Sequence, residues 1–227
     1  KLLTEKRKAY ESHPIDENVP LDDSYTGVAL TTGHLQRVAM LPAVMGYVRG
    51  GGKLLAMQKI WQEDKDAIDA SLLADIGIAD VGPAADVPGI YVVTNFLVGA
   101  KGFSFNGGDS YTTQVNRTTL TPDAEVQIAT AEGVPLVWKK SLGDGHVYMY
   151  NGVERDDKTN LGVYMAMLAH CGTDPIYPVV GVKIFILDDF PAPVPDGDFP
   201  HIYNELGVDT ATFYRKVWWP FVRKLAK

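Results

Sequence analysis

The sequence predicts an α/β fold built on a doubly wound sheet, and two observations lead to this prediction. Apolar stretches typical of strands alternate with stretches whose apolar residues recur every three or four positions, as on one face of a helix. In the second half of the chain, short strand-like stretches follow one another across Gly and Asp-Gly turns. Strands alternating with helices and followed by a short antiparallel edge indicate a doubly wound sheet.

The first half of the chain predicts strand, helix, strand and helix in that order. Residues 25–31 (YTGVALT) form the first expected strand. The apolar face of the first expected helix consists of Leu35, Val38, Leu41, Met45 and Val48. Pro42 interrupts this helix and is expected to kink it, and the glycines at 50–52 are expected to end it. The next expected elements are a strand at 53–57, a helix at 62–76 and a loop at 80–88.

The second half is richer in strands. The four expected strands are 91–98, 125–130, 134–139 and 146–150. The polar, Gly-rich stretch 99–116 is expected to be a long loop or a ragged hairpin. Helical character returns at 161–170, so the sheet is expected to be covered by a helix there.

Composition limits the class of protein. The chain has 227 residues, 46% of them apolar and 22% charged, as in an ordinary globular protein. A net charge of −7 argues against a nucleic-acid partner, because no Lys/Arg cluster offsets the acidity. Cys171 is the only cysteine, which excludes an intramolecular disulfide and a cysteine-rich zinc site. No stretch approaches the length of a membrane span. The chain begins at Lys1, without an initiator Met and inside a plausible helix, so we expect it to be an excised piece of a longer protein.

Two segments suggest a known fold. Residues 47–57 (YVRGGGKLLAM) and 135–150 (PLVWKKSLGDGHVYMY), with their flanking helices, resemble the class I glutamine amidotransferase-like fold, a flavodoxin-like α/β sheet. Enzymes of that family attack amides with a Cys on a tight strand-to-helix turn. Here Cys171 ends a predicted helix, and the adjacent His170 projects about 100° away from it. The resemblance therefore implies a non-catalytic amidotransferase-like domain at 20–172, after an N-terminal extension at 1–19.

A pair of carboxylates ends an apolar run near the C-terminus. Residues 182–187 (VKIFIL) have strand character and lead directly into Asp188 and Asp189. Carboxylates at the carboxyl end of a buried strand lie where α/β folds keep their chemistry. One of the two can bind a metal while the other takes a proton. The alternative is that both cap a turn before Pro191.

The same residues carry a second resemblance. The segment ILDDFPAP at 186–193 is similar to the first motif of NodB-type polysaccharide deacetylases. The resemblance implies that Asp188 is the catalytic base and that Asp189 binds a divalent, zinc-like metal together with two histidines of a later His-x-x-x-His motif. Phe190 replaces the usual Gly, and no His-x-x-x-His occurs before Lys227. Residues 173–227 are therefore expected to be the first elements of a deacetylase-like barrel, with the metal bound in the full-length protein only.

Together these segments resemble an uncharacterised bacterial family that joins an amidotransferase-like domain to a deacetylase-like barrel. The resemblance implies an accessory N-terminal portion of a carbohydrate deacetylase-like hydrolase, inactive by itself. Its implied partners are acetylated polysaccharide and the missing C-terminal part of the same protein, in the cell envelope or outside the cell. The alternative is a non-catalytic scaffold module that binds a glycan or a protein.

Three further side chains are open to two interpretations. His201 is either a residue of a helical first turn or a ligand that completes a site with the aspartates. Trp218 and Trp219 either stack on a sugar ring or belong to an amphipathic helix. The core face of that helix would consist of Phe213, Val217 and Phe221.

Overall fold

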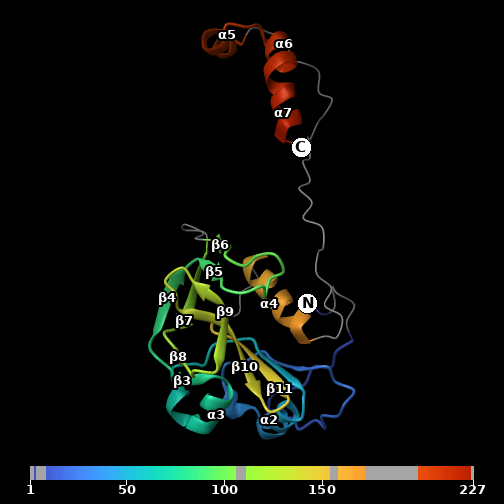
Figure 1. Ribbon diagram of the computed structural model, residues 1–227, viewed down its shortest axis with the longest axis vertical. Helices are drawn as coiled ribbons and strands as arrows, with labels where there is room; N and C mark the ends of the chain where they lie inside the picture. The colour runs from blue at the N-terminus through green and yellow to red at the C-terminus, as the bar shows by residue number, and fades with distance from the viewer. Residues whose placement is uncertain (1–2, 4–8, 106–110, 154–157, 172–198, 226–227) are drawn as a thin grey trace. The chain divides into compact units, whose positions relative to one another are not determined.

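The structure, a computed structural model, describes residues 3, 9–105, 111–153, 158–171 and 199–225 (Figure 1). The chain forms two compact units, Lys1–Tyr177 and Pro178–Lys227. The first unit contains a mixed sheet with helices, so the predicted α/β class is confirmed. The predicted domain boundaries at 19/20 and 172/173 stay predictions.

One end of the main sheet is parallel. Among the described residues, seven strands form this sheet in the order β1-β2-β11-β10-β9-β5-β6. The parallel strands are β1 (Val28–Leu30), β2 (Lys53–Ala56) and β11 (Gly145–Tyr150). Ala29 of β1 lies opposite Leu55 of β2, which in turn lies opposite Tyr148 of β11. The carboxyl ends of all three strands therefore meet at one edge of the sheet.

The rest of the sheet is antiparallel, as the sequence predicted for the second half of the chain. Its strands are β10 (Pro135–Leu142), β9 (Ala124–Thr130), β5 (Ile90–Val92) and β6 (Ser104–Phe105). Two short antiparallel pairs lie beside it: β3 (Ile78–Asp80) with β8 (Thr119–Leu120), and β4 (Ala84–Pro88) with β7 (Thr112–Asn116). The second of these pairs matters for function, because β7 ends at Asn116.

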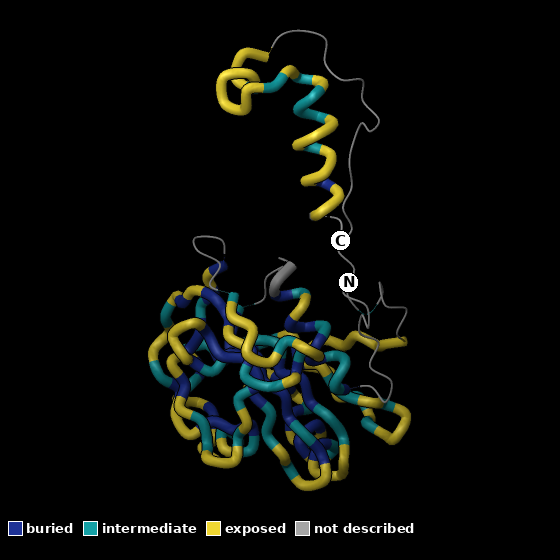
Figure 2. Tube along the Cα trace, turned by 45° about the horizontal axis from the view of Figure 1, so that its top comes forward, coloured by how far each residue is buried: buried dark blue, intermediate teal, exposed yellow. Residues whose placement is uncertain are grey.

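Helices pack on both faces of the parallel strands (Figure 1). The helical elements of this unit are η1 (Leu35–Arg37), α2 (Leu41–Arg49), η2 (Lys65–Ala67), α3 (Ala70–Asp75) and α4 (Lys158–Cys171). Because successive side chains of a strand point to opposite faces, Leu54 joins the apolar cluster under α2, and Leu55 joins the cluster under α4. Figure 2 shows the buried residues concentrated in this unit.

The structure corrects several sequence-based expectations. The helix expected along 35–48 is divided into η1 and α2, and of the strand expected at 91–98 only its first two residues lie in β5. Pro42 lies in the first turn of α2 and begins the helix instead of kinking it, since a first-turn residue needs no amide hydrogen. The helix expected at 62–76 is divided into η2 and α3. The stretch 80–88, expected to be a loop, contains β4, and 99–116 contains β6 and β7. In both stretches the strands form because they pair with strands that are distant in sequence, which the local sequence did not indicate.

The described part of the second unit is helical. It contains α5 (Pro200–Leu206), α6 (Thr210–Phe213), a π-helical turn η4 (Tyr214–Trp218) and α7 (Trp219–Leu225). Val217 and Phe221 were expected in the core of an amphipathic helix, yet they are 42% and 59% exposed. The strand expected at 182–187 lies outside the described residues. No helix in the described part of the chain has the length and apolarity needed to span a membrane.

Candidate functional site

Polar side chains gather at the edge where β1, β2 and β11 end. His34 follows β1, Lys59 and Trp61 follow β2, and Asn151 directly follows β11. Ligands of open α/β sheets bind outside the carboxyl ends of the strands. We call the group formed by His34, Lys59, Trp61, Asp64 and Asn116 the carboxyl-edge cluster.

Backbone contacts fix the loops that carry this cluster. The Lys59 amide donates to the Gly152 carbonyl at 2.8 Å, which ties the loop after β2 to the loop after β11. The loop after β1 approaches just as closely, since a Cβ atom on Gly33 would lie 2.0 Å from the Lys59 carbonyl oxygen. Position 33 therefore requires glycine, and the cluster rests on rigid connections.

An imidazole–carboxylate pair forms the first half of the cluster. His34 Nδ1 is hydrogen-bonded to the Asp64 carboxylate, and these side chains are 27% and 7% exposed. The Trp61 ring stacks on the imidazole with a centroid distance of 5.8 Å and an interplanar angle of 22°. Asp64 thereby orients the ring, and within the described residues Nε2 has no hydrogen-bond partner.

A buried cation forms the second half. Lys59 is 1% exposed, and its Nζ lies 3.4 Å from Asn116 Oδ1 and 4.8 Å from the centroid of the Trp61 ring. Burial lowers the pKa of Lys59, and the negative charge of Glu63 opposes this shift more weakly. No carboxylate of the described residues forms an ion pair with Lys59. Trp61 contacts both Lys59 and His34, so the two halves form one cluster.

Asn116 is held in a single orientation. Its Nδ2 donates to the Ile60 carbonyl at 2.7 Å, and its Oδ1 accepts from Gln62 Nε2 at 3.0 Å. Its backbone exchanges hydrogen bonds with the Asn151 side chain, at 3.2 Å from the amide and 2.7 Å to the carbonyl. The amide oxygen of Asn116 therefore faces Lys59. This acceptor holds the Lys59 ammonium, which is the donor, in a fixed position.

The cluster is suited to polar binding. It contains a partly exposed imidazole nitrogen and a buried ammonium group, while hydroxyl and thiol groups of the described residues make no hydrogen bond with the His34 ring. Nor do any three His, Cys, Asp or Glu side chains of the described residues lie where together they could hold a metal ion.

None of the sequence-predicted site residues is part of the carboxyl-edge cluster as the structure describes it. Asp188 and Asp189 fall outside the described residues, so their predicted roles stay predictions. His201 lies in the first turn of α5, one of the two places anticipated for it. The carboxyl-edge cluster was not predicted. The available signal was position alone, since His34 and Lys59 each follow an expected strand by a few residues.

The side chains of Cys171 and His170 pack against the interior of the first unit. The Cys171 thiol is buried, and burial raises its pKa to about 12 although Lys53 opposes the shift. His170 stacks on Phe96 at 4.5 Å, and its Nε2 lies 3.1 Å from the Phe96 carbonyl oxygen. The expectation that these neighbours form no nucleophile–base pair therefore agrees with their contacts.

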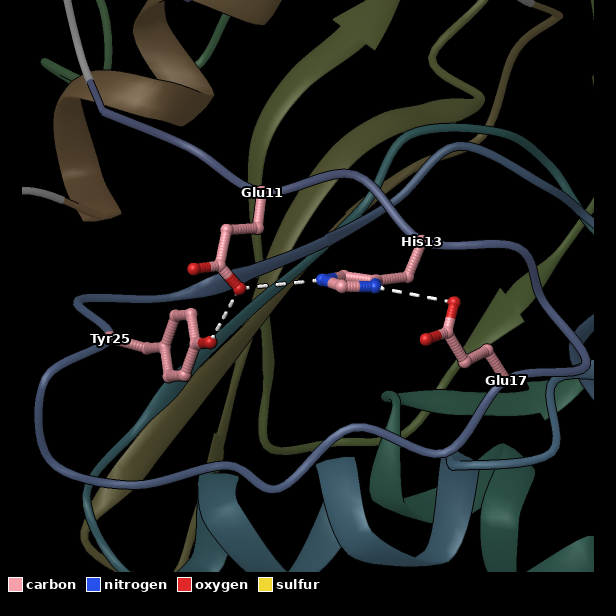
Figure 3. Close-up of polar contacts among 4 residues, drawn as sticks. All are labelled: Glu11, His13, Glu17 and Tyr25. Carbon is pink, nitrogen blue, oxygen red and sulfur yellow. Dashed lines mark hydrogen bonds and ion pairs between the residues drawn. The ribbon is translucent and has the colours of Figure 1, made fainter.

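A second polar group lies on the surface near the N-terminus (Figure 3). His13 lies between the carboxylates of Glu11 and Glu17, at 3.4 and 3.3 Å, and Tyr25 donates to Glu11 at 2.8 Å. The hydrogen bond from Tyr25 lowers the pKa of Glu11. These exposed contacts link the N-terminal segment to the residues just before β1, and solvent screens them.

The surface has an open depression, and two of its lining residues, Lys65 and Asp66, directly follow Asp64 of the carboxyl-edge cluster in the sequence. It has a volume of about 170 Å³, and it is lined by Lys65, Asp66, Leu73, Ala79, Asp80 and Val81. Ligand pockets usually enclose roughly 300 Å³ or more. The depression is therefore too small and too open to serve as the site by itself.

Comparison with known proteins gives a family and distant structural similarities. The family described as "Uncharacterised protein conserved in bacteria (DUF2194)" matches residues 110–227, just over half of the chain. No curated protein matches. Cytoplasmic Protein STM3548 from Salmonella typhimurium is similar at 17% identity and a TM-score of 0.42, over 59% of this chain and 60% of that one. The exo-beta-1,4-mannosidase Op5Man5 from Opitutaceae bacterium strain TAV5 is similar at 18% identity and a TM-score of 0.41, over 66% of this chain and 24% of that one.

Proposed function

We propose that this chain, which belongs to the DUF2194 family of bacterial proteins, uses its α/β unit as a non-catalytic binding module with the carboxyl-edge cluster as its ligand site. The observation that carries the proposal is the composition of this cluster. Lys59, His34 and Asn116 place oriented polar groups at the edge of the sheet where such folds bind ligands, and no hydroxyl or thiol of the described residues hydrogen-bonds to the His34 ring.

The position of the thiol argues in the same direction. Cys171 ends α4, and its pKa of about 12 leaves almost no thiolate at neutral pH. An amidotransferase relative with this thiol has no means of attacking an amide. We also propose that the sheet is related to the flavodoxin-like sheet of the amidotransferase-like fold. In this proposal the unit keeps the ligand-binding edge of that fold and lacks its catalytic nucleophile.

The experiment is a glycan array followed by calorimetry with the whole chain. We expect binding that His34→Gln weakens roughly tenfold, the effect of losing one charge-assisted hydrogen bond. The matched control, Asp188→Asn combined with Asp189→Asn, should bind as the unaltered chain does. Release of acetate from an acetylated oligosaccharide by this chain would contradict a non-catalytic role.

A second candidate concerns the longer protein, and the segment ILDDFPAP at 186–193 favours it. In this proposal the α/β unit is the accessory portion of a carbohydrate deacetylase-like hydrolase of the cell envelope. Asp188 serves as base, and Asp189 holds a divalent metal together with ligands outside this chain. Acetate release by the full-length protein supplied with zinc, cobalt or nickel tests it, and an inactive full-length protein would contradict it.

A further inference from the structure

We infer that the carboxyl-edge cluster recognises one anionic group, a carboxylate or a phosphate, which pairs with the buried ammonium of Lys59. This inference rests on the proposed binding function and names its ligand class. Its basis is an imbalance in the cluster. Lys59 is 1% exposed, and within the described residues its ammonium hydrogen-bonds only to Asn116 Oδ1, at 3.4 Å, so this buried cation lacks an ion-pair partner there.

The other charges of the cluster do not supply that partner. The Asp64 carboxylate is hydrogen-bonded to His34 Nδ1 and forms no ion pair with Lys59. Glu63 is exposed and makes no ion pair with Lys59, so solvent screens its charge. The Lys59 ammonium therefore has no directly paired carboxylate in the described residues, and one anionic group would supply that partner.

The donors are arranged for a single small group. Asn116 is fixed by Ile60 and Gln62, and it holds the Lys59 ammonium next to Trp61. An ammonium has three donor hydrogens, and Asn116 occupies one of them. His34 is the more exposed member, and its Nε2 makes no hydrogen bond within the described residues. The remaining ammonium hydrogens of Lys59 are therefore the donors that a compact anion would use.

The ionisation of Lys59 supports this arrangement. Burial lowers the pKa of Lys59, so the free protein pays for the charged form. A bound anion would favour that form and offset the cost of burial.

The experiment is calorimetry on the whole chain with three probes: a tetrasaccharide of glucuronic acid, the matched tetrasaccharide of glucose, and glucose 6-phosphate. We expect one or both charged probes to bind at least roughly tenfold more tightly than the neutral one, with the difference shrinking at high salt. Glucuronate binding assigns the anion to a carboxylate, and binding of glucose 6-phosphate assigns it to a phosphate.

Variants test the role of Lys59. Lys59→Met keeps the apolar stem and removes the charge, and it should abolish the preference for charged probes. Lys53→Met is the matched control, because Lys53 begins the strand whose other end leads to Lys59, and it should keep the preference. The salt dependence of the unaltered chain gives a readout that needs no variant.

The outcomes separate this inference from the proposed function. Equal affinity for charged and neutral tetrasaccharides overturns the inference and leaves the binding module standing. A preference that survives Lys59→Met overturns the assignment to Lys59. No binding of any probe, together with no binding on the glycan array, overturns both.

Discussion

The pKa values of Lys59 and Cys171 are shifted for the same reason, the loss of water around these side chains. Lys59 is held at the carboxyl edge of the sheet among Asn116 and Trp61, and its pKa is lowered. Cys171 is buried at the end of α4, and its pKa is raised to about 12. Burial disfavours the charged form of either group, so the lysine loses its proton more readily and the thiol keeps it. Burial therefore lowers the pKa of the lysine and raises the pKa of the thiol.

At the residue scale, we predict that Lys59→Met increases stability at neutral pH. The unfolded chain holds the Lys59 proton more readily than the folded chain, so burial of the charge destabilises the fold below the lowered pKa. This penalty disappears as the pH rises through the lowered pKa towards the ordinary lysine value of about 10.4. Thermal unfolding should show a gain in Tm at pH 7 that shrinks as the pH is raised. A gain independent of pH would contradict the assignment to Lys59.

Also at the residue scale, native Cys171 should react slowly with iodoacetamide at neutral pH. The thiolate is the reactive form, and a pKa of about 12 makes it rare. Mass spectrometry during labelling measures the rate, and the chain unfolded in denaturant is the control that should label fast. Rapid stoichiometric labelling of the folded chain would instead mark Cys171 as a reactive thiol.

At the element scale, α4 meets the start of β1 at a contact that leaves room for no additional atom. A Cβ atom on Gly27 would lie 2.8 Å from Cys171 Sγ and 3.2 Å from the Lys53 carbonyl oxygen. The carbonyl belongs to β2 and cannot move without disturbing the sheet. The seam between β1, β2 and α4 therefore depends on the absence of a side chain at position 27.

We predict that Gly27→Ala lowers the free energy of unfolding by about 1–3 kcal/mol, the usual cost of overpacking. Part of this loss should be recovered when Cys171→Ala is combined with it, because the sulfur is one of the two obstacles. Gly46→Ala on α2 is the control, since its Cβ would meet nothing within 4 Å and should stabilise the helix by about 0.5–1 kcal/mol. Urea unfolding of five chains gives the comparison: the unaltered chain, Gly27→Ala, Cys171→Ala, their combination and Gly46→Ala. Additive losses of Gly27→Ala and Cys171→Ala would rule out the Gly27–Cys171 contact.

At the scale of the whole molecule, the two units differ in how many apolar side chains they bury. Both apolar clusters are built from residues of the first unit, whereas the described helices of the second unit expose Tyr203, Val217 and Phe221. The second unit also contains the predicted metal ligand Asp189, which lies outside the described residues. Any metal function of this chain therefore depends on ligands beyond the described site.

We predict that the whole chain binds zinc no more tightly than high micromolar. Two adjacent carboxylates without an imidazole form an oxygen-only site, which suits hydrated hard cations better than zinc. Calorimetry with zinc measures this, and Asp189→Ala should leave the unfolding curve unchanged. Tight binding abolished by His201→Ala would show instead that His201 completes a site with the aspartates.

The sequence by itself determined the α/β class, the positions of the strands at 53–57, 125–130, 134–139 and 146–150, and the antiparallel second half. These follow from apolar periodicity, which is a local property. It misjudged Pro42 and the stretches 80–88 and 99–116, where a first-turn position or pairing with a distant strand decides the conformation.

Only the tertiary structure decided the site. His34, Lys59 and Asn116 are separated by 25 and 57 residues in sequence, and no short motif joins them. Parallel pairing of β1, β2 and β11 brings the first two to one edge, and the ladder of β4 with β7 places Asn116 beside Lys59. The burial of Lys59, which has no ion-pair partner in the described part of the chain, arises only when these segments meet. Sequence patterns report which residues face a core, whereas long-range strand pairing determines which polar side chains share a site.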